Sequence, residues 1–136
     1  DGNTSTMVHP NNTFDLPGEY LVTLIATDEK GCKDTIQKPI TIIEAHYIYV
    51  PNTFTPHDGD RFNSTFFASV YGISTLNVQI FNRWGEMIFE SNDPRFKWDG
   101  TYNGAICQDG TYTYKINYSA NSGFVGFLVG HINLIK

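Results

Sequence analysis

The sequence predicts an all-β protein built from immunoglobulin-like antiparallel β-sandwich domains. Apolar and polar residues alternate with a period of two along several segments, which is the spacing of strands with one buried face. Turn sequences rich in Gly, Asn and Asp separate these segments, and aromatic residues, which make up 15% of the chain, stand beside the main turns. No segment between residues 50 and 136 has helical periodicity, so short strands joined by turns are the expected architecture.

The length and charge of the chain restrict its function. Its 136 residues fit one ordinary domain or two small ones, and no apolar run is long enough to cross a bilayer. The net charge of −5 argues against binding nucleic acid or an anionic membrane surface through bulk electrostatics. No signal peptide opens the chain, since Asp1-Gly2-Asn3 is polar and turn-like, and we expect the chain to be the tail of a longer protein.

Residues 1–43 contain one predicted hairpin. Along residues 19–27, Tyr20, Val22, Leu24 and Ala26 share one strand face, and along residues 35–43 Ile36, Ile40 and Ile42 point one way. A turn at residues 28–31 joins the two segments as antiparallel strands. A hairpin alone leaves an apolar face and a sheet edge unpaired, so it makes a poor independent structure. We therefore expect residues 1–43 to be the C-terminal part of a sandwich whose first strands lie upstream.

A second sandwich domain is predicted at residues 50–136, after a linker at residues 44–49. Leu76, Val78 and Ile80 alternate with polar residues, the chain turns at residues 83–86, and residues 87–90 return as the partner strand. A tight hairpin turn is expected at Asn103-Gly104, because both residues accept positive φ at low cost. The last strand is predicted at residues 124–135. One face of the strand before it carries Tyr112, Tyr114, Ile116 and Tyr118.

Two sets of motifs resemble known families. The first, in residues 1–43, includes Asp1-Gly2-Asn3-Thr4-Ser5, Phe14, Pro17-Gly18-Glu19-Tyr20 and Gly31-Cys32, and it resembles the second half of a PKD domain. That family is an immunoglobulin-like sandwich of extracellular bacterial proteins. The second set consists of Val50-Pro51-Asn52-Thr53-Phe54-Thr55-Pro56, Phe66, Ile80-Phe81-Asn82-Arg83-Trp84-Gly85-Glu86, Ile88-Phe89-Glu90, Trp98-Asp99-Gly100, Gly110-Thr111-Tyr112 and Leu134-Ile135-Lys136. Its order over residues 50–136 resembles the gliding-motility-associated C-terminal domain, the type B sorting domain of the type IX secretion system in Bacteroidetes.

The second resemblance implies a role as a secretion signal. Such a domain passes through the periplasm, is recognised at the outer membrane and directs its cargo to the cell surface. The resemblance implies an outer-membrane partner of the PorP/SprF kind, together with the translocon, and large gliding adhesins are typical cargo. It implies neither a small-molecule substrate nor an enzymatic activity.

The candidate recognition residues lie in two turns and in the last strand. They are Arg83, Trp84, Gly85, Trp98, Asp99, Ile132, Leu134, Ile135 and Lys136. Arg and Trp are common in interface hot spots, which favours a protruding epitope at Arg83-Trp84. The alternative interpretation has Trp84 covering the edge of the core, with Arg83 stacked on an aromatic ring or paired with Asp99.

For the second turn, a structural role is the expected one. Asp99 suits an Asx turn, and Gly100 suits a positive φ. The last strand is a candidate for partner binding by strand addition at a sheet edge, because its glycines, Gly126 and Gly130 among them, leave room for a close approach. We expect deletion of residues 132–136 to abolish export.

A calcium site is a weaker candidate. Asp58, Asp60 and Asn63 place three oxygen ligands in one glycine-bent loop, which is suitable chemistry for Ca²⁺. Ser64 replaces the final acid of the family's loop, and the Arg61 guanidinium lowers cation affinity, so a solvated turn is the alternative. No other cofactor is expected.

The remaining reactive residues give no catalytic pattern. The histidines are dispersed, and no metal-ligand or nucleophile motif includes them. Cys32 and Cys107 lack zinc-knuckle spacing, and an upstream partner for Cys32 is expected over a bond between the two. Two alternative functions stay open: a purely structural stalk or tip module of an adhesin, and a carbohydrate-binding accessory domain of a secreted hydrolase.

Overall fold

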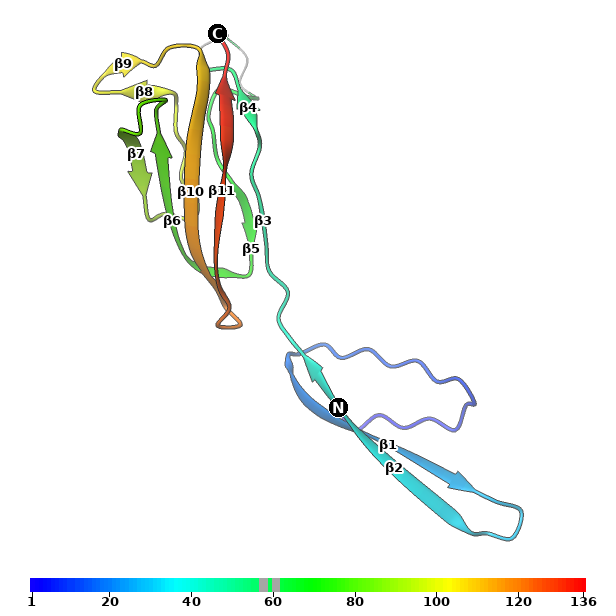
Figure 1. Cartoon of the computed structure of the whole chain (residues 1–136). Helices are drawn as coiled ribbons and strands as arrows, with labels where there is room; N and C mark the ends of the chain where they lie inside the picture. The colour runs from blue at the N-terminus through cyan, green and yellow to red at the C-terminus, as the bar shows by residue number, and fades with distance from the viewer. Residues whose placement is uncertain (57–58, 60–61) are drawn as a thin grey trace. The chain divides into compact units, whose positions relative to one another are not determined.

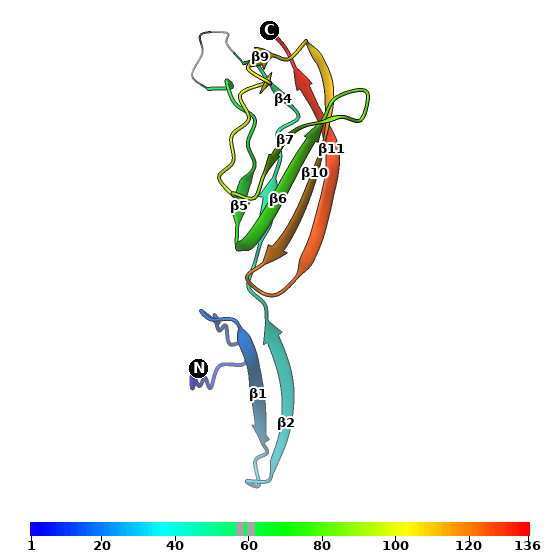
Figure 2. The same ribbon diagram turned by 90° about the vertical axis from the view of Figure 1, so that its left-hand side faces the viewer.

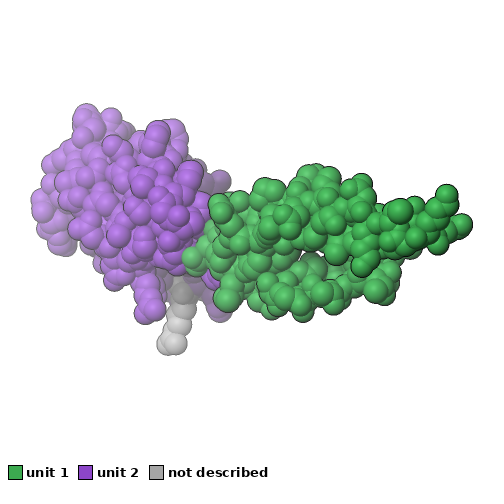
Figure 3. Space-filling model, turned by 90° about the horizontal axis from the view of Figure 1, so that it is seen from below, with its two compact units in different colours: residues 1–44 green, residues 45–136 purple. Residues whose placement is uncertain are grey.

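The computed structural model describes residues 1–56, 59 and 62–136 and divides the chain into two compact units. Unit 1 comprises residues 1–44 and unit 2 comprises residues 45–136 (Figure 3). The described residues form strands and turns without a helix, so the predicted all-β class is confirmed.

Unit 1 contains one antiparallel hairpin. Strand β1 (Gly18–Thr27) pairs with β2 (Lys33–Ile42) along its full length (Figure 1). The turn between them is the predicted one: the side chain of Asp28 accepts hydrogen bonds from the backbone amides of Lys30 and Cys32, each at 2.8 Å. Gly31 completes this turn with a φ of +81°, which a residue with a side chain rarely adopts.

Apolar side chains of unit 1 stay exposed, as the sequence predicts for an isolated hairpin. All of residues 1–44 are described, and none of them is buried. Leu24 is 63% exposed, and Leu21, Ile25 and Ile36 are similarly accessible. Because the hydrophobic contribution to stability scales with the apolar area removed from water, backbone pairing contributes most of the order in this unit.

Unit 2 is a sandwich based on a five-stranded sheet with the order β4-β11-β10-β6-β7 (Figures 1 and 2). These strands are β4 (Thr53–Phe54), β11 (Val125–Leu134), β10 (Gly110–Ala120), β6 (Ile73–Phe81) and β7 (Met87–Ser91). All neighbouring pairs are antiparallel except β4 and β11, which run parallel. The long β10–β11 hairpin therefore provides the centre and one side of the sheet.

Shorter elements complete unit 2. Strand β3 (Tyr47–Tyr49) pairs with β5 (Ser69–Tyr71), and Phe66 forms an isolated bridge with Trp98. Strands β8 (Thr101–Tyr102) and β9 (Ala105–Ile106) form a small hairpin. The predicted linker at residues 44–49 is therefore divided: Glu44 belongs to unit 1, while residues 47–49 are a paired strand of unit 2.

The core of unit 2 contains the apolar residues that the alternation of apolar and polar residues along the strands predicts to be buried. Val78, Ile80 and Ile116 are fully buried, and so are Phe66 and Ile132. Aromatic rings extend this core, since Trp98 lies 5.3 Å from Phe54 and 5.5 Å from Tyr112 between ring centroids. Such pairs stabilise a core beyond their area of burial.

Candidate functional site

The side chain of Asn82 holds the turn between β6 and β7 in one conformation by accepting hydrogen bonds from backbone amides of the turn. The Asn82 side-chain oxygen accepts hydrogen bonds from the amides of Trp84 and Glu86, both at 3.0 Å. The Asn82 side-chain amide donates to the Glu86 carboxylate at 2.9 Å, and Gly85 adopts a φ of +80°. The Asn-Arg-Trp-Gly order therefore builds one defined turn, in which asparagine binds the backbone and glycine supplies the left-handed conformation.

Trp84 projects from this turn into solvent. Its side chain is 77% exposed, so the interpretation that it covers the edge of the core is wrong. The Arg83 guanidinium lies 5.2 Å from the centre of the Trp84 ring, within the range of a cation–π contact. The predicted stacking of Arg83 on an aromatic ring is thus observed, and the pair forms a protruding surface.

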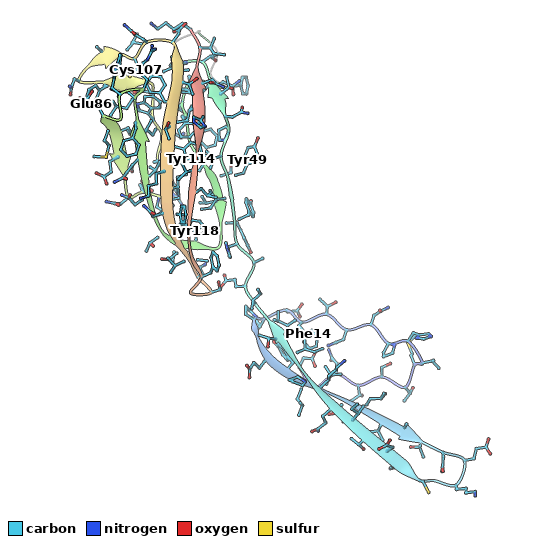
Figure 4. All side chains as sticks on the ribbon, in the orientation of Figure 1. Phe14, Tyr49, Glu86, Cys107, Tyr114 and Tyr118 are labelled. Atoms are coloured by element: carbon cyan, nitrogen blue, oxygen red, sulfur yellow. The ribbon has the colours of Figure 1, made fainter. Side chains whose placement is uncertain are left out.

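A groove of about 270 Å³ separates this turn from the β8–β9 hairpin. Arg83 and Trp84 line it on the turn side, and Ile106 and Cys107 line it on the hairpin side, next to Ile88 and Tyr112 of the core. Figure 4 labels Glu86 and Cys107 at this end of unit 2. The sequence predicts the turn at Asn103-Gly104, but no signal in it indicates that this hairpin lies beside Trp84.

The β8–β9 hairpin has the predicted turn. Asn103 and Gly104 have φ values of 51° and 77°, the two successive positive values of a type I′ turn. The hairpin is also tied to the neighbouring turn, because the Tyr102 hydroxyl donates to the Glu86 carboxylate at 2.9 Å. This hydrogen bond raises the pKa of Tyr102 above its ordinary value.

Trp98 and Asp99 have structural positions. Trp98 is only 1% exposed, and its indole N–H donates to the carbonyl oxygen of Thr101 at 3.0 Å, so it is unavailable to a partner in the folded domain. The Asp99 carboxylate accepts from the Thr101 amide at 3.0 Å, and Gly100 has a φ of +79°. The predicted Asx turn is therefore present, while a direct recognition role for Trp98 is contradicted.

The end of the last strand is partly core. Ile132 and Leu134 are buried, whereas Ile135 and Lys136 are exposed. The edge is closed here, because Asn133 donates its amide to the carbonyl oxygen of Asn52 at 2.8 Å, beside β4. The expectation that Ile132 and Leu134 face a partner is thus wrong: their side chains help to build the sandwich.

The open part of the β11 edge lies earlier in the strand. The amides of Asn133 and Ile135 point toward β4, and backbone groups alternate in direction along a strand. The amides of Val125, Phe127, Val129 and His131 therefore point toward the same edge of the sheet. These residues precede Asn133 and Leu134, the two residues of β11 that pair with β4. Residues 125–131 also contain no Asp, Glu, Lys or Arg, although charged side chains are a common protection of exposed edges.

The glycines of β11 do not leave room for a partner. A Cβ atom added at Gly126 would lie 2.7 Å from the Tyr118 hydroxyl, and one added at Gly130 would collide with the Tyr114 ring. Both tyrosines are the cross-strand neighbours of these glycines on β10. The predicted space is thus filled by rings from the same sheet.

The exposed candidates gather at one end of unit 2. The β6–β7 turn, the β8–β9 hairpin and the C-terminus lie together there in both ribbon views (Figures 1 and 2). Lys136 forms an exposed ion pair with Asp109 at 3.8 Å, and Asp109 follows Gln108 of the groove. The fold therefore brings Arg83, Trp84 and Gly85 to the same end as Ile135 and Lys136.

The other predicted sites stay without support from the structure. Asp58 and Asp60 lie outside the described residues, and the backbone carbonyl of Asn63 accepts a hydrogen bond from Thr55 at 2.9 Å. The calcium site therefore stays a prediction. Within the described part of the chain, no group of three His, Cys, Asp or Glu side chains could hold a metal ion.

The two cysteines are free and differ in environment. Cys32 is exposed on unit 1, and Cys107 is half-buried in the groove of unit 2. Burial raises the pKa of the Cys107 thiol above its ordinary value, which makes this thiol a poor nucleophile at neutral pH. No helix in the described residues is long and apolar enough to cross a membrane.

Over the described residues, these features define an all-β module with exposed turns and an open sheet edge. Residues 48–129 match the family model described as the CHU_C type IX secretion signal domain, and residues 1–43 match that of the PKD domain. The chain belongs to the family of type IX secretion signal domains. Both matched domains are of non-catalytic kinds, and a type IX signal implies interaction with that secretion system and export to the cell surface.

One curated relative is also similar. Collagenase ColQ1 of Bacillus cereus (strain Q1) is 30% identical over 84 residues, which represent 60% of this chain and 9% of the collagenase. The chain thus spans less than a tenth of that relative. No solved structure matches the chain.

Proposed function

We propose that unit 2 is a C-terminal sorting signal that directs a large cell-surface protein, of the gliding-adhesin kind, through the type IX system of a Bacteroidetes cell. The observation that carries this proposal is the family match over residues 48–129, which includes the main sheet from β4 to the first half of β11. The cargo crosses the periplasm in this scheme and is recognised at the outer membrane. A PKD domain directly upstream suits such an owner.

The partner in this proposal is an outer-membrane component of the PorP/SprF kind, which hands the cargo to the translocon. It contacts the exposed end of unit 2, where Arg83, Trp84 and Gly85 protrude near Ile135 and Lys136. Trp98, Asp99, Ile132 and Leu134 act indirectly, because they hold the turns and the last strand in place.

A strand of the partner can also add to the open edge of β11 between residues 125 and 131. Phe127 is 69% exposed there and has Val125 and Val129 beside it on the same face. Strand addition obtains affinity from backbone hydrogen bonds and selectivity from alternate side chains. Phe127→Pro removes one outward amide and should weaken export, whereas Phe127→Ala keeps that amide and serves as its control.

The function is tested by fusing residues 45–136 to an inert reporter that has its own export signal. The fusion should begin at residue 45, because β3 pairs within unit 2. Secretion that requires this tail supports the signal, and periplasmic retention of every fusion would remove it. Deleting only Ile135 and Lys136 tests the exposed terminus without removing the core residues Ile132 and Leu134.

A carbohydrate-binding role is the second candidate, favoured by exposed tyrosines on β3 and β5. Tyr47 and Tyr71 are cross-strand neighbours with ring centroids 5.7 Å apart, and both are mostly exposed, as is Tyr49. Aromatic faces of this kind stack on sugar rings. Binding of the purified chain to a glycan array, lost in Tyr47→Ala with Tyr71→Ala, would favour this role over a sorting signal or a plain structural stalk.

A further inference from the structure

The groove between the β6–β7 turn and the β8–β9 hairpin combines apolar walls with one positive charge. Trp84 and Ile106 are both at least half exposed at its rim, and the buried side chains of Ile88 and Tyr112 line it from the core side. Tryptophan is the residue type most enriched at interface hot spots, particularly beside a pocket. The apolar walls therefore suit a large apolar side chain.

The charge in this groove belongs to Arg83. Its guanidinium lies over the Trp84 ring on one side, and one of its nitrogens lies 3.2 Å from the position that a Cβ atom at Gly110 would take. The nearby carboxylates have other partners: Glu86 accepts from Asn82 and Tyr102, and Asp109 pairs with Lys136. Arg83 forms no ion pair with a carboxylate of the described residues. Its cation is thus available to an occupant.

The groove is also held open by hydrogen bonds that need no occupant. Asn82 fixes the turn on one wall, and the Tyr102–Glu86 hydrogen bond fixes the hairpin against that turn. A preformed site loses less conformational entropy on binding than a loop that must first become ordered. A short segment that binds in the groove therefore does not have to order the turn and the hairpin that form its walls.

We propose that this groove binds an acidic segment of a protein partner, in which a carboxylate pairs with Arg83 and a neighbouring apolar side chain packs against Trp84 and Ile106. An arginine fork suits a carboxylate, since two parallel N–H donors meet its two oxygens. The proposal rests on the proposed function, because the segment would belong to the outer-membrane partner that recognises the sorting signal. The proposal names the chemistry by which that partner would bind the sorting signal.

The test uses the whole chain and a capped peptide that carries a glutamate beside a phenylalanine. A matched peptide with glutamine in place of the glutamate tests the charge without altering the protein. Acrylamide quenching reports binding, because Trp84 is exposed while Trp98, the other tryptophan, is buried. Alkylation of Cys107 reports the location, and the exposed Cys32 of unit 1 is the internal reference.

The glutamate peptide should protect both Trp84 from quenching and Cys107 from alkylation, with Cys32 unaffected. Arg83→Gln should weaken its binding about tenfold, the usual range for losing a charge-assisted hydrogen bond. The matched control is Lys97→Gln, which removes the same charge from a second groove of about 370 Å³ and should leave binding unchanged. Thermal unfolding of both variants checks that they are folded.

Four outcomes would each overturn the proposal. They are equal binding of the two peptides, an equal loss of affinity in the Arg83→Gln and Lys97→Gln variants, alkylation of Cys107 that the peptide does not slow, and no binding of either peptide. These outcomes are independent of export. If the reporter fusion is secreted but the peptide does not bind, the sorting function holds, and the partner recognises the signal through a surface other than the groove. If the peptide binds but the fusion is retained, the groove is a binding site and the sorting function fails.

Discussion

The ring of Tyr114 on β10 lies against Gly130 on β11, in the space that a side chain at position 130 would fill. The same relationship joins Tyr118 to Gly126 four residue pairs along the hairpin. Each glycine thus admits an aromatic ring from within the sheet, which packs the inner face of the β10–β11 hairpin.

Gly130→Ala should destabilise unit 2 because its new methyl group would collide with the Tyr114 ring. Overpacking of this kind costs roughly 1–3 kcal/mol. Urea unfolding followed by circular dichroism measures the loss. Val129→Ala on the same strand is the control, since Val129 is mostly exposed and its truncation should cost less than about 0.5 kcal/mol. Equal effects of the two substitutions would contradict this packing.

Gly100→Ala should cost more than Gly104→Ala, although the two glycines have nearly the same φ of +79° and +77°. Alanine in this left-handed conformation costs roughly 1–2 kcal/mol at either position. At Gly100 the added Cβ atom would also lie 3.0 Å from Pro56 and 3.2 Å from Leu134, whereas at Gly104 it meets nothing within 4 Å. The unfolding free energies of the two variants measure the difference, and its absence would show that the Trp98-Asp99-Gly100 turn is not packed on the last strand.

Unit 2 should lose stability as the pH rises above about 9. Burial raises the pKa of Cys107 above its ordinary 9.0, and it raises the pKa values of Tyr112 and Tyr114 above their ordinary 10.0. The folded state thus holds these protons more tightly, so its stabilisation is complete below the ordinary values and is lost as the pH rises through the raised ones. Urea unfolding between pH 8 and pH 11 under reducing conditions checks this.

Tyr112→Phe should flatten that pH dependence, because it removes one of the groups with a raised pKa while keeping the ring. A stability that is constant or increases between pH 9 and pH 11 would be inconsistent with the raised pKa values. The thiols give a second readout: Cys107 should alkylate more slowly than the exposed Cys32 at pH 8, since Cys107 is half-buried and burial raises its pKa.

Residues 45–136 should unfold cooperatively by themselves, whereas residues 1–44 should not. All buried apolar side chains of the described residues lie between Phe54 and Leu134, within unit 2. Differential scanning calorimetry of the two fragments tests this. A cooperative transition in the 1–44 fragment would mean that its exposed hairpin has a source of stability other than burial.

Strand alternation and turn chemistry predicted most of the fold. The alternation at Leu76, Val78 and Ile80 selected a buried face, and Asn103-Gly104 selected a type I′ turn, because both signals are local. The pairing of residues 47–49 with β5 was missed, because a three-residue strand has no periodicity of its own. Only residues 47–49 of the predicted linker are therefore a strand.

The candidate site was harder to predict, because exposure depends on packing between distant segments. Trp84 and Trp98 both follow the same rule of an aromatic beside a tight turn, yet one is exposed and the other is buried. The glycine at position 130 indicated a close approach correctly, but the approaching group is Tyr114 of the same sheet. The sequence alone does not specify which group fills a space.

The most direct test of the sorting function is the surface fraction of the reporter fused to residues 45–136, measured by protease accessibility on intact cells. The measurement compares a Bacteroidetes strain with a type IX translocon and the same strain without it. We predict a surface-exposed reporter in the first strain and a periplasmic one in the second. A reporter that stays in the periplasm of both strains, or reaches the surface of both, would contradict the assignment of unit 2 as a type IX sorting signal.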